Sequence, residues 1–322
     1  MNRMNLKSIS FRHPYLFALL LLVVTLGANF FFQPNMFELR ILSGNLRVFL
    51  PLMILAAGQT VVIIGGGIDL SAGTMVSMNV AVLVTLITKD SPTGQILVGV
   101  AAAVAAGVLA GALNGFCVAY LRLQPIVTTY ATSFLFAGVA LWVLPRPGGL
   151  YPSYLTKLYR ETPLGIPLAL WVAAVLVLLW VAARGMRYGR YLFAVGGKPE
   201  AAYATGVPVS LVRFSTYVIA GVSSALAAFA LTLGTGSGHP RIGNDMTLSS
   251  IVAVVLGGTR LSGGQGGVAG SLIGVVILGI IRNIISFASV PTWWQTLVDA
   301  IIIVVALAGP GFVRLLRGRR QP

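Results

Sequence analysis

Long apolar runs separated by short polar segments recur from one end of the chain to the other. A membrane-spanning helix needs about 20 mostly apolar residues, and ten runs approach this length. We expect spans at 15–32, 48–64, 72–88, 96–121, 126–144, 167–183, 211–233, 247–259, 268–287 and 296–313. The eighth run is short and ends in two glycines, so it is a candidate for a broken or re-entrant helix. The pattern predicts an all-α polytopic membrane protein with about ten transmembrane helices.

The composition supports a surface that faces lipid. Of 322 residues, 57% are hydrophobic and only 9% are charged, whereas a water-soluble domain has about a quarter of its residues charged. The net charge of +15 does not indicate a nucleic-acid partner, because the basic residues lie between apolar runs. Cys117 is the one cysteine, and His13 and His239 are far apart. We therefore expect neither a disulfide nor a metal site.

The basic residues indicate the orientation in the membrane. Ten crossings place both termini on one side, and 14 of the 22 basic residues fall on that side, with 8 on the other. Cytoplasmic loops carry the excess of Lys and Arg, so both termini are predicted to be cytoplasmic. The first run follows Arg3, Lys7 and Arg12, but it is longer than the apolar region of a secretion signal. We interpret it as an uncleaved anchor.

Residues 184–210 form the one extended hydrophilic segment inside the chain, and the predicted orientation makes it cytoplasmic. Pro199 suits a first helical turn, Glu200 suits the positive end of a helix, and Gly206 suits a C-terminal stop. These signals predict a short helix over 200–205. So short a helix is marginal alone in water, so it must pack against its own bundle or against a partner. The alternative is a basic connecting loop.

A glycine-rich motif occurs twice. Residues 66–73 and 257–264 align without gaps at a constant offset of 191, and each follows an aliphatic run. The repeat suggests an internal duplication with glycine-interrupted helices, and such helices at corresponding places in two halves point to a transport pathway. The alternative for each motif alone is a tight turn between hairpin spans at the membrane surface.

Polar residues within the apolar runs are candidates for a translocation path. Asp69 and Asp299 are acids in or beside spans, where a carboxylate costs about 2.5–3.5 kcal/mol; Asp69 either lines the path or caps the helix that begins at Ser71. Uncharged donors and acceptors suit a polyhydroxyl solute, although they also join helices by hydrogen bonds. The path candidates are Gln59, Thr60, Gly66, Gly67, Asp69, Ser71, Asn79, Asn114, Thr128, Thr129 and Asn283.

One motif is misleading. Residues 261–265 spell LSGGQ, the signature of ATP-binding-cassette ATPases. Such an ATPase also needs a phosphate loop, in which a glycine-flanked Lys precedes Ser or Thr. Of the four lysines only Lys7 precedes a Ser, and Leu6 stands where glycine is required. We interpret the signature as a coincidence within the glycine repeat.

Together these motifs carry a resemblance to a known family. They are GGIDLS at 66–71, GRY at 189–191, GGKPEAA at 196–202, TGV at 205–207 and VVLGGT at 254–259. In order and spacing the chain resembles the permease subunit of ribose-type monosaccharide ATP-binding-cassette importers, from about residue 45 to 310. It departs from the family at 247–251, where TLSSI replaces a common ELDAI, and this leaves the sugar open.

The resemblance implies a function and a set of partners. The chain would be a single transmembrane permease domain, 1–322, in the bacterial cytoplasmic (inner) membrane. It would pair with an identical or related permease on two ATPase subunits, which bind ATP and Mg, and a soluble extracytoplasmic sugar-binding protein would deliver the solute. No catalytic residue or cofactor is expected on this chain. The residues that would contact the ATPase are Gly197, Pro199, Glu200, Ala201, Ala202 and Gly206.

Two further points complete the expectations. The exterior segments 145–166 and 234–246 are candidate docking surfaces for the binding protein, the second through His239, Arg241 and Asp245.

An ion-coupled secondary transporter is the alternative function, but it usually needs intramembrane carboxylates, and only Asp69 and Asp299 could serve. An intramembrane enzyme would need convergent acids, bases or metal ligands, for which the chain offers little material.

Overall fold

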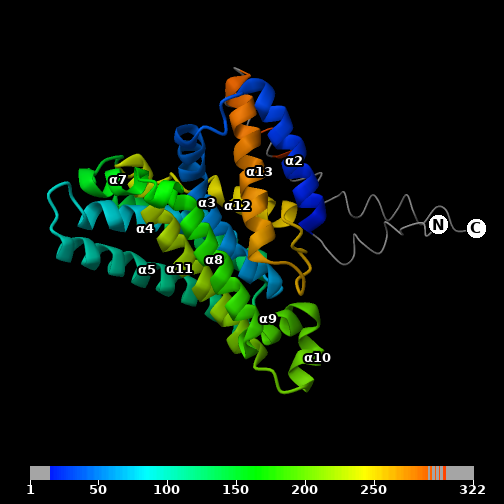
Figure 1. Cartoon of the computed structure of the whole chain (residues 1–322). Helices are drawn as coiled ribbons and strands as arrows, with labels where there is room; N and C mark the ends of the chain where they lie inside the picture. Colours follow the sequence, from blue (N-terminus) through cyan, green and yellow to red (C-terminus); the bar gives the residue numbers. More distant parts are fainter. Residues whose placement is uncertain (1–14, 289–290, 292–293, 295–296, 298–299, 302–322) are drawn as a thin grey trace, which may run out of the picture.

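The computed structural model describes residues 15–288, 291, 294, 297 and 300–301, and within them the regular structure is helical (Figure 1). The elements follow in the order α2 (Tyr15–Phe32), α3 (Leu39–Ile64), α4 (Ala72–Leu86), α5 (Thr93–Ala119), α6 (Pro125–Val143), α7 (Ser153–Arg160), the 3₁₀ helix η1 (Pro163–Gly165), α8 (Leu168–Gly185), α9 (Arg187–Gly197), α10 (Pro199–Ala204), α11 (Val209–Thr235), α12 (Met246–Leu256) and α13 (Val268–Phe287).

The helices agree with the first nine predicted spans. Among the described residues, α3, α5, α6, α8, α11 and α13 are long and apolar enough to cross a membrane, and α4, α12 and the part Ala18–Phe32 of α2 are shorter apolar helices. Of the tenth predicted span, 296–313, only residues 297, 300 and 301 are described, so the span as a whole is not tested. The all-helical architecture is therefore confirmed, whereas the number of about ten crossings is not.

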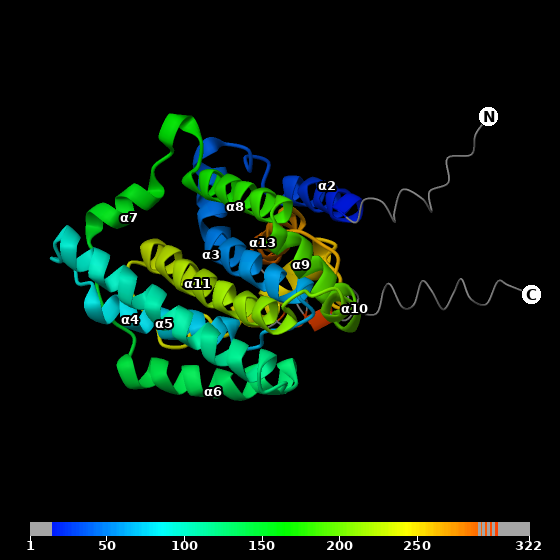
Figure 2. The same cartoon turned by 90° about the horizontal axis from the view of Figure 1, so that it is seen from below.

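α3 is the central helix. In its most apolar 18-residue window 83% of the residues are buried, compared with 11% for α8. α11 packs along both α3 and α5, and Figure 2 shows it between them, with α6 on the outer flank. α3 also begins nine residues before the predicted span, because Arg40, Asn45 and Arg47 lower the hydropathy of its first turns without breaking the helix.

Glycines allow α5 and α11 to approach closely. A Cβ atom added at Gly107 would overlap the carbonyl oxygen of Gly221, and one added at Gly221 would overlap the carbonyl oxygen of Gly107. Gly111, one turn along α5, meets the backbone of Tyr217 in the same way. Small residues four positions apart are typical of membrane helices packed backbone to backbone. This contact was not predicted from the sequence.

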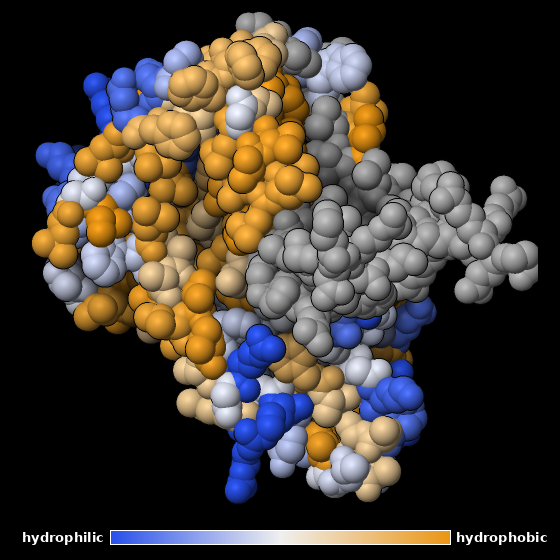
Figure 3. Space-filling view, turned by 45° about the vertical axis from the view of Figure 1, so that its right-hand side comes forward, coloured by the Kyte–Doolittle hydropathy of each residue, from blue (hydrophilic) through white to orange (hydrophobic). Residues whose placement is uncertain are grey.

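The hydrophilic segment 184–210 forms two helices at the lower tip of the molecule (Figure 1). The short helix expected at 200–205 is confirmed as α10, within the usual uncertainty of helix ends. α9 was not predicted, although Leu192 and Val195 lie on its buried face while Arg187 and Arg190 are exposed. Figure 3 shows apolar side chains over the middle of one face and hydrophilic residues gathered at the lower tip and the upper left edge.

Candidate functional site

The first glycine motif ends a helix. α3 ends at Ile64, and Gly66 has the left-handed φ of +82° that glycine adopts without strain. The Gly66 N–H donates to the carbonyl of Ile63 at 3.0 Å, and the Gly67 N–H donates to that of Val62 at 3.0 Å. This pair of bonds is a Schellman cap, which satisfies carbonyls at the end of a helix.

The second motif ends α12 in the same way. Gly258 has a φ of +87°, and its N–H donates to Val255 at 2.9 Å while that of Thr259 donates to Val254 at 3.1 Å. α3 ends at Ile64 and α12 at Leu256, so the equivalent caps are 192 residues apart rather than the 191 of the sequence alignment. The glycines thus end two helices, each followed in the chain by another apolar helix, instead of interrupting one helix.

Both motifs meet segment 184–210 at one place, which we call the glycine junction: Ile64, Gly66, Gly196, Gly263 and Gly264. The Gly264 N–H donates to the carbonyl of Ile64 at 2.9 Å, so the second motif helps to cap the helix of the first. A Cβ atom at Gly196 would overlap the Ile64 carbonyl oxygen and lie 2.7 Å from the Gly264 nitrogen. One at Gly263 would lie 3.0 Å from the Gly66 Cα. Three chain segments therefore touch through their backbones.

The predicted ATPase-contacting residues lie at the last residue of α9, in α10 and at the C-terminal end of α10. Pro199 is in the first turn, Glu200 and Ala201 are exposed, and Ala202 is buried. Gly206 has a φ of +81° and its N–H bonds Tyr203, which confirms it as the C-terminal stop. Exposed Gly197 has open space where a Cβ would lie.

α9 is also attached to the bundle by a side-chain contact. The hydroxyls of Tyr188 on α9 and Ser215 on α11 share a hydrogen bond of 3.0 Å. Burial raises the pKa of the Tyr188 hydroxyl, so the phenol stays neutral at physiological pH. A neutral, partly buried hydrogen bond holds α9 in place without an ionic contact that salt would weaken.

Some of the predicted path residues form one buried network beside the first motif. The Asp69 carboxylate accepts from the backbone N–H and the hydroxyl of Ser71 at 2.8 and 2.6 Å. Asn114 on α5 donates to the Ser71 hydroxyl at 2.7 Å and accepts from Thr132 on α6 at 2.6 Å. Gln59 on α3 donates to the Asp69 carbonyl at 3.3 Å.

The network therefore links α3, α5 and α6 through the turn between α3 and α4. Thr129 joins it by accepting from the Leu70 N–H at 3.0 Å. Thr132 was missed from the sequence, although it lies one helical turn from Thr128 and three residues from Thr129. α4 begins at Ala72 rather than Ser71, and the Asp69 carboxylate binds the residue just before it, at the helix end that favours negative charge.

The other path candidates lie elsewhere. Thr60 donates to Ser271 on α13 at 2.7 Å, and Asn79 donates to Ser224 on α11 at 3.0 Å. Thr128 donates to the carbonyl of Gln124, the residue just before its own helix α6, and Asn283 is on α13. Thr60 and Asn79 thus join pairs of helices, as polar residues in membranes commonly do. Whether any of these residues lines a path stays a prediction.

The position of Asp69 leads to a first test. In Asp69→Asn the amide oxygen can accept the same two hydrogen bonds, so uptake by the complete transport system should be nearly unchanged. Asp69→Leu leaves the buried Ser71 N–H unsatisfied, which costs about 1–3 kcal/mol, and should lower both the melting temperature and uptake. Parallel uptake and thermal-unfolding measurements check this. Normal stability with complete loss of uptake in Asp69→Asn would instead indicate that the charge takes part in transport.

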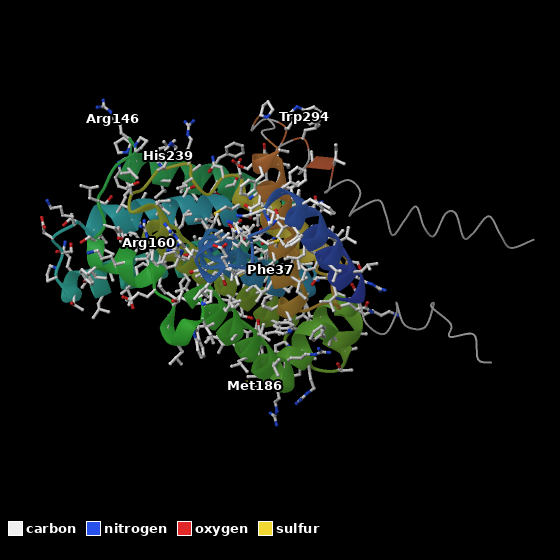
Figure 4. The ribbon with its side chains drawn as sticks, turned by 45° about the horizontal axis from the view of Figure 1, so that its top comes forward. Phe37, Arg146, Arg160, Met186, His239 and Trp294 are labelled. Atoms are coloured by element: carbon white, nitrogen blue, oxygen red, sulfur yellow. The ribbon has the colours of Figure 1, made fainter. Side chains whose placement is uncertain are left out.

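The two candidate docking segments are joined to each other. Gly148 and Gly238 form an isolated antiparallel bridge, with N–H to carbonyl distances of 3.0 and 2.8 Å. His239, Arg241 and Asp245 are all exposed. Figure 4 places His239 near Arg146 and far from Met186, which precedes α9. The candidate docking surface and segment 184–210 therefore lie at different ends of the molecule. Among the described residues no group of three His, Cys, Asp or Glu could hold a metal ion.

Comparisons with known proteins identify the family of the chain. Residues 41–307 match the family model described as branched-chain amino acid transport system / permease component. The ribose import permease protein RbsC of Escherichia coli K12 is 33% identical over 299 residues, 91% of this chain and 90% of the relative.

Two further relatives are import permeases from other bacteria. RbsC of Bacillus subtilis is 36% identical over 297 residues, 91% of this chain and 89% of the relative. The autoinducer 2 import system permease protein LsrD of Photorhabdus temperata is 28% identical over 290 residues, 86% of this chain and 85% of the relative. No solved structure matches significantly.

Proposed function

The chain belongs to the permease-component family whose model it matches, and from this premise we propose that it is the transmembrane permease subunit of an ATP-binding-cassette importer. The solute is a monosaccharide or a similar small polyhydroxyl compound. The similarity to ribose import permeases over about nine-tenths of both chains supports this class. The relatives also include an autoinducer 2 permease, so the family alone does not select one solute.

The glycine junction is the structural observation that carries the proposal. Segment 184–210 touches the end of α3 and the turn between α12 and α13 through backbone atoms, and both α3 and α12 lead directly into another apolar helix. A displacement of α9 and α10 must therefore move the turn between α3 and α4 and the turn between α12 and α13. This is the geometry expected of an element that transmits force from outside the membrane into a helix bundle.

The mechanism follows from this geometry. Two permeases, identical or related, rest on two ATPase subunits, with both termini of each permease in the cytoplasm of a bacterial cell. α10 seats on an ATPase subunit, and closure of the ATPase pair around ATP and Mg moves α10 and α9. The glycine junction passes this movement to the helix pairs, which shift between outward-open and inward-open arrangements. A soluble binding protein delivers the solute at the end that carries His239, Arg241 and Asp245.

The decisive test separates ATP-driven from ion-driven transport. Uptake is measured in vesicles that contain the complete importer, the binding protein and an internal ATP-regenerating system, with and without a proton uncoupler and a sodium ionophore. We expect uptake to persist with both agents and to stop when a non-hydrolysable ATP analogue replaces ATP. Loss of uptake with either agent at constant ATP would favour the ion-coupled alternative.

A further inference from the structure

A cavity of about 610 Å³ adjoins the glycine junction at Gly66 and extends to α10 and to the start of α11. Its walls are the turn between α5 and α6, the first turns of α11, the residues Gly65, Gly66 and Gly67, and α10. The α10 wall consists of Pro199, Glu200 and Tyr203. The cavity therefore separates the coupling helix from the bundle that it is proposed to move.

The lining of this cavity is positively charged. Arg122 and Arg213 both line it, and Glu200 is the one acidic residue in the lining. Within the part of the chain that the structure describes, neither guanidinium makes a hydrogen bond or an ion pair with a protein group. Arginine forms paired hydrogen bonds with phosphate and carboxylate groups. Two such side chains at one cavity favour an anionic occupant.

The start of α11 adds donors to the same cavity. α11 begins at Val209, after Pro208, and has no side-chain cap. Val209 and Ser210 line the cavity. The Val209 N–H donates to the carbonyl of Val207 at 2.8 Å, so within the described residues the donors left at this helix start begin with the Ser210 N–H. The first N–H groups of a helix lack partners within the helix, and the helix dipole favours an anion there. Arg213 is in the second turn of α11, where the helix dipole disfavours a cation. An anion bound between Arg213 and the first turn of α11 would relieve this repulsion.

Tyr217, one further turn along α11, supplies an independent indication. Its side chain lines the cavity, yet the residue is only 1% exposed. Its hydroxyl makes no hydrogen bond of regular geometry, although the charges of Asp69 and Arg213 both act on it and the backbone of Ile68 is near. Buried hydroxyls are nearly always hydrogen-bonded. A ligand that accepts this proton would complete the arrangement.

We infer that this cavity binds a phosphate-bearing ligand. Its phosphate would lie between the guanidiniums of Arg122 and Arg213 and the first turn of α11, and its remaining atoms would extend towards Tyr217. The phosphate can come from a soluble metabolite, such as a sugar phosphate, or from the headgroup of an anionic lipid. An occupant would fill the space between α10 and α11 and so restrain α10. The effect on coupling rests on the proposed function, whereas binding does not.

The experiment uses the purified full-length chain in nanodiscs of phosphatidylcholine. Ribose 5-phosphate and inorganic phosphate are titrated, with ribose as the probe that lacks a phosphate. In a second arm, the chain is placed in nanodiscs that contain phosphatidylglycerol, and the lipids that remain bound are identified by native mass spectrometry. The variants are Arg122→Gln with Arg213→Gln and, separately, Tyr217→Phe. The control is Arg187→Gln, an exposed arginine on α9 that does not line the cavity.

The two arms distinguish the sources of the phosphate. Binding of ribose 5-phosphate that weakens at least about tenfold in the double variant, equivalent to 1.4 kcal/mol, and stays unchanged in Arg187→Gln supports a soluble ligand. Retention of phosphatidylglycerol with the same dependence supports a lipid. Tyr217→Phe should weaken whichever ligand binds. Absence of binding in both arms, or binding that the double variant retains, overturns the inference without affecting the proposed transport function.

Discussion

Gly196→Ala is expected to reduce uptake by the complete importer at least about tenfold, while the protein still inserts into the membrane. The added methyl group would overlap the Ile64 carbonyl oxygen and lie 2.7 Å from the Gly264 nitrogen. Both neighbours are backbone atoms, joined by a 2.9 Å hydrogen bond, so no side chain can rotate away. α9 must move outward, and overpacking of this kind costs about 1–3 kcal/mol.

The Gly196→Ala substitution should affect solute uptake and ATP hydrolysis differently. If α9 is displaced at the glycine junction, α10 can still reach an ATPase subunit, but its movement no longer reaches the end of α3 and the turn between α12 and α13. We therefore expect ATP hydrolysis to continue and to lose its dependence on the loaded binding protein. Both activities are measured on the same reconstituted importer.

The matched control is Gly185→Ala, a glycine at the end of α8 and one residue from α9's N-cap. A Cβ atom at Gly185 meets nothing within 4 Å, so this variant should transport normally. Equal uptake by Gly196→Ala and Gly185→Ala would show that α9 can move away from the glycine junction without consequence. The role proposed for the junction would then be wrong.

Local signals in the sequence predicted the parts of this structure that depend on neighbouring residues. Apolar runs are sufficient to locate nine helices because a membrane span is selected by length and hydropathy. Pro199 and Gly206 predicted α10, since proline favours a helix start and glycine adopts the left-handed cap conformation. The glycine motifs were recognised for the same reason, but their register was one residue off, because the alignment matched letters rather than helix ends.

The contacts between distant segments could not be predicted in this way. Nothing in the residues around Gly196 indicates that they meet Ile64 and Gly264, because that contact depends on how the ends of α3 and α9 and the turn between α12 and α13 are arranged in space. The candidate path residues show the same limit. Gln59, Asp69 and Asn114 converge, whereas Thr60 and Asn79 bind other helices, and hydropathy alone treats all five alike.

Gly221→Ala is expected to lower the stability of the whole bundle. The added methyl group would overlap the Gly107 carbonyl oxygen and lie 3.2 Å from the Gly111 Cα. α11 also packs against α3, so it cannot retreat from α5 without disturbing the central helix. We expect a loss of about 1–3 kcal/mol, measured as a lower melting temperature of the purified chain in detergent.

Gly138→Ala is the control for this substitution. Gly138 lies in the middle of α6, and a Cβ atom there meets nothing within 4 Å. Alanine has the higher helix propensity, so the melting temperature should stay the same or rise slightly. A similar fall in both variants would show that the loss reflects replacement of a helical glycine in general and not the contact between α5 and α11.

Gly107→Ala provides a test of the contact itself. Each of Gly107 and Gly221 meets the carbonyl oxygen of the other, so either methyl group alone must push the same two backbones apart. Once the first substitution has separated them, the second has less to displace. The double variant should therefore lose less stability than the sum of the two single losses, because residues in contact are not additive. Additive losses would mean that each methyl group is accommodated separately and that α5 and α11 do not meet at these glycines.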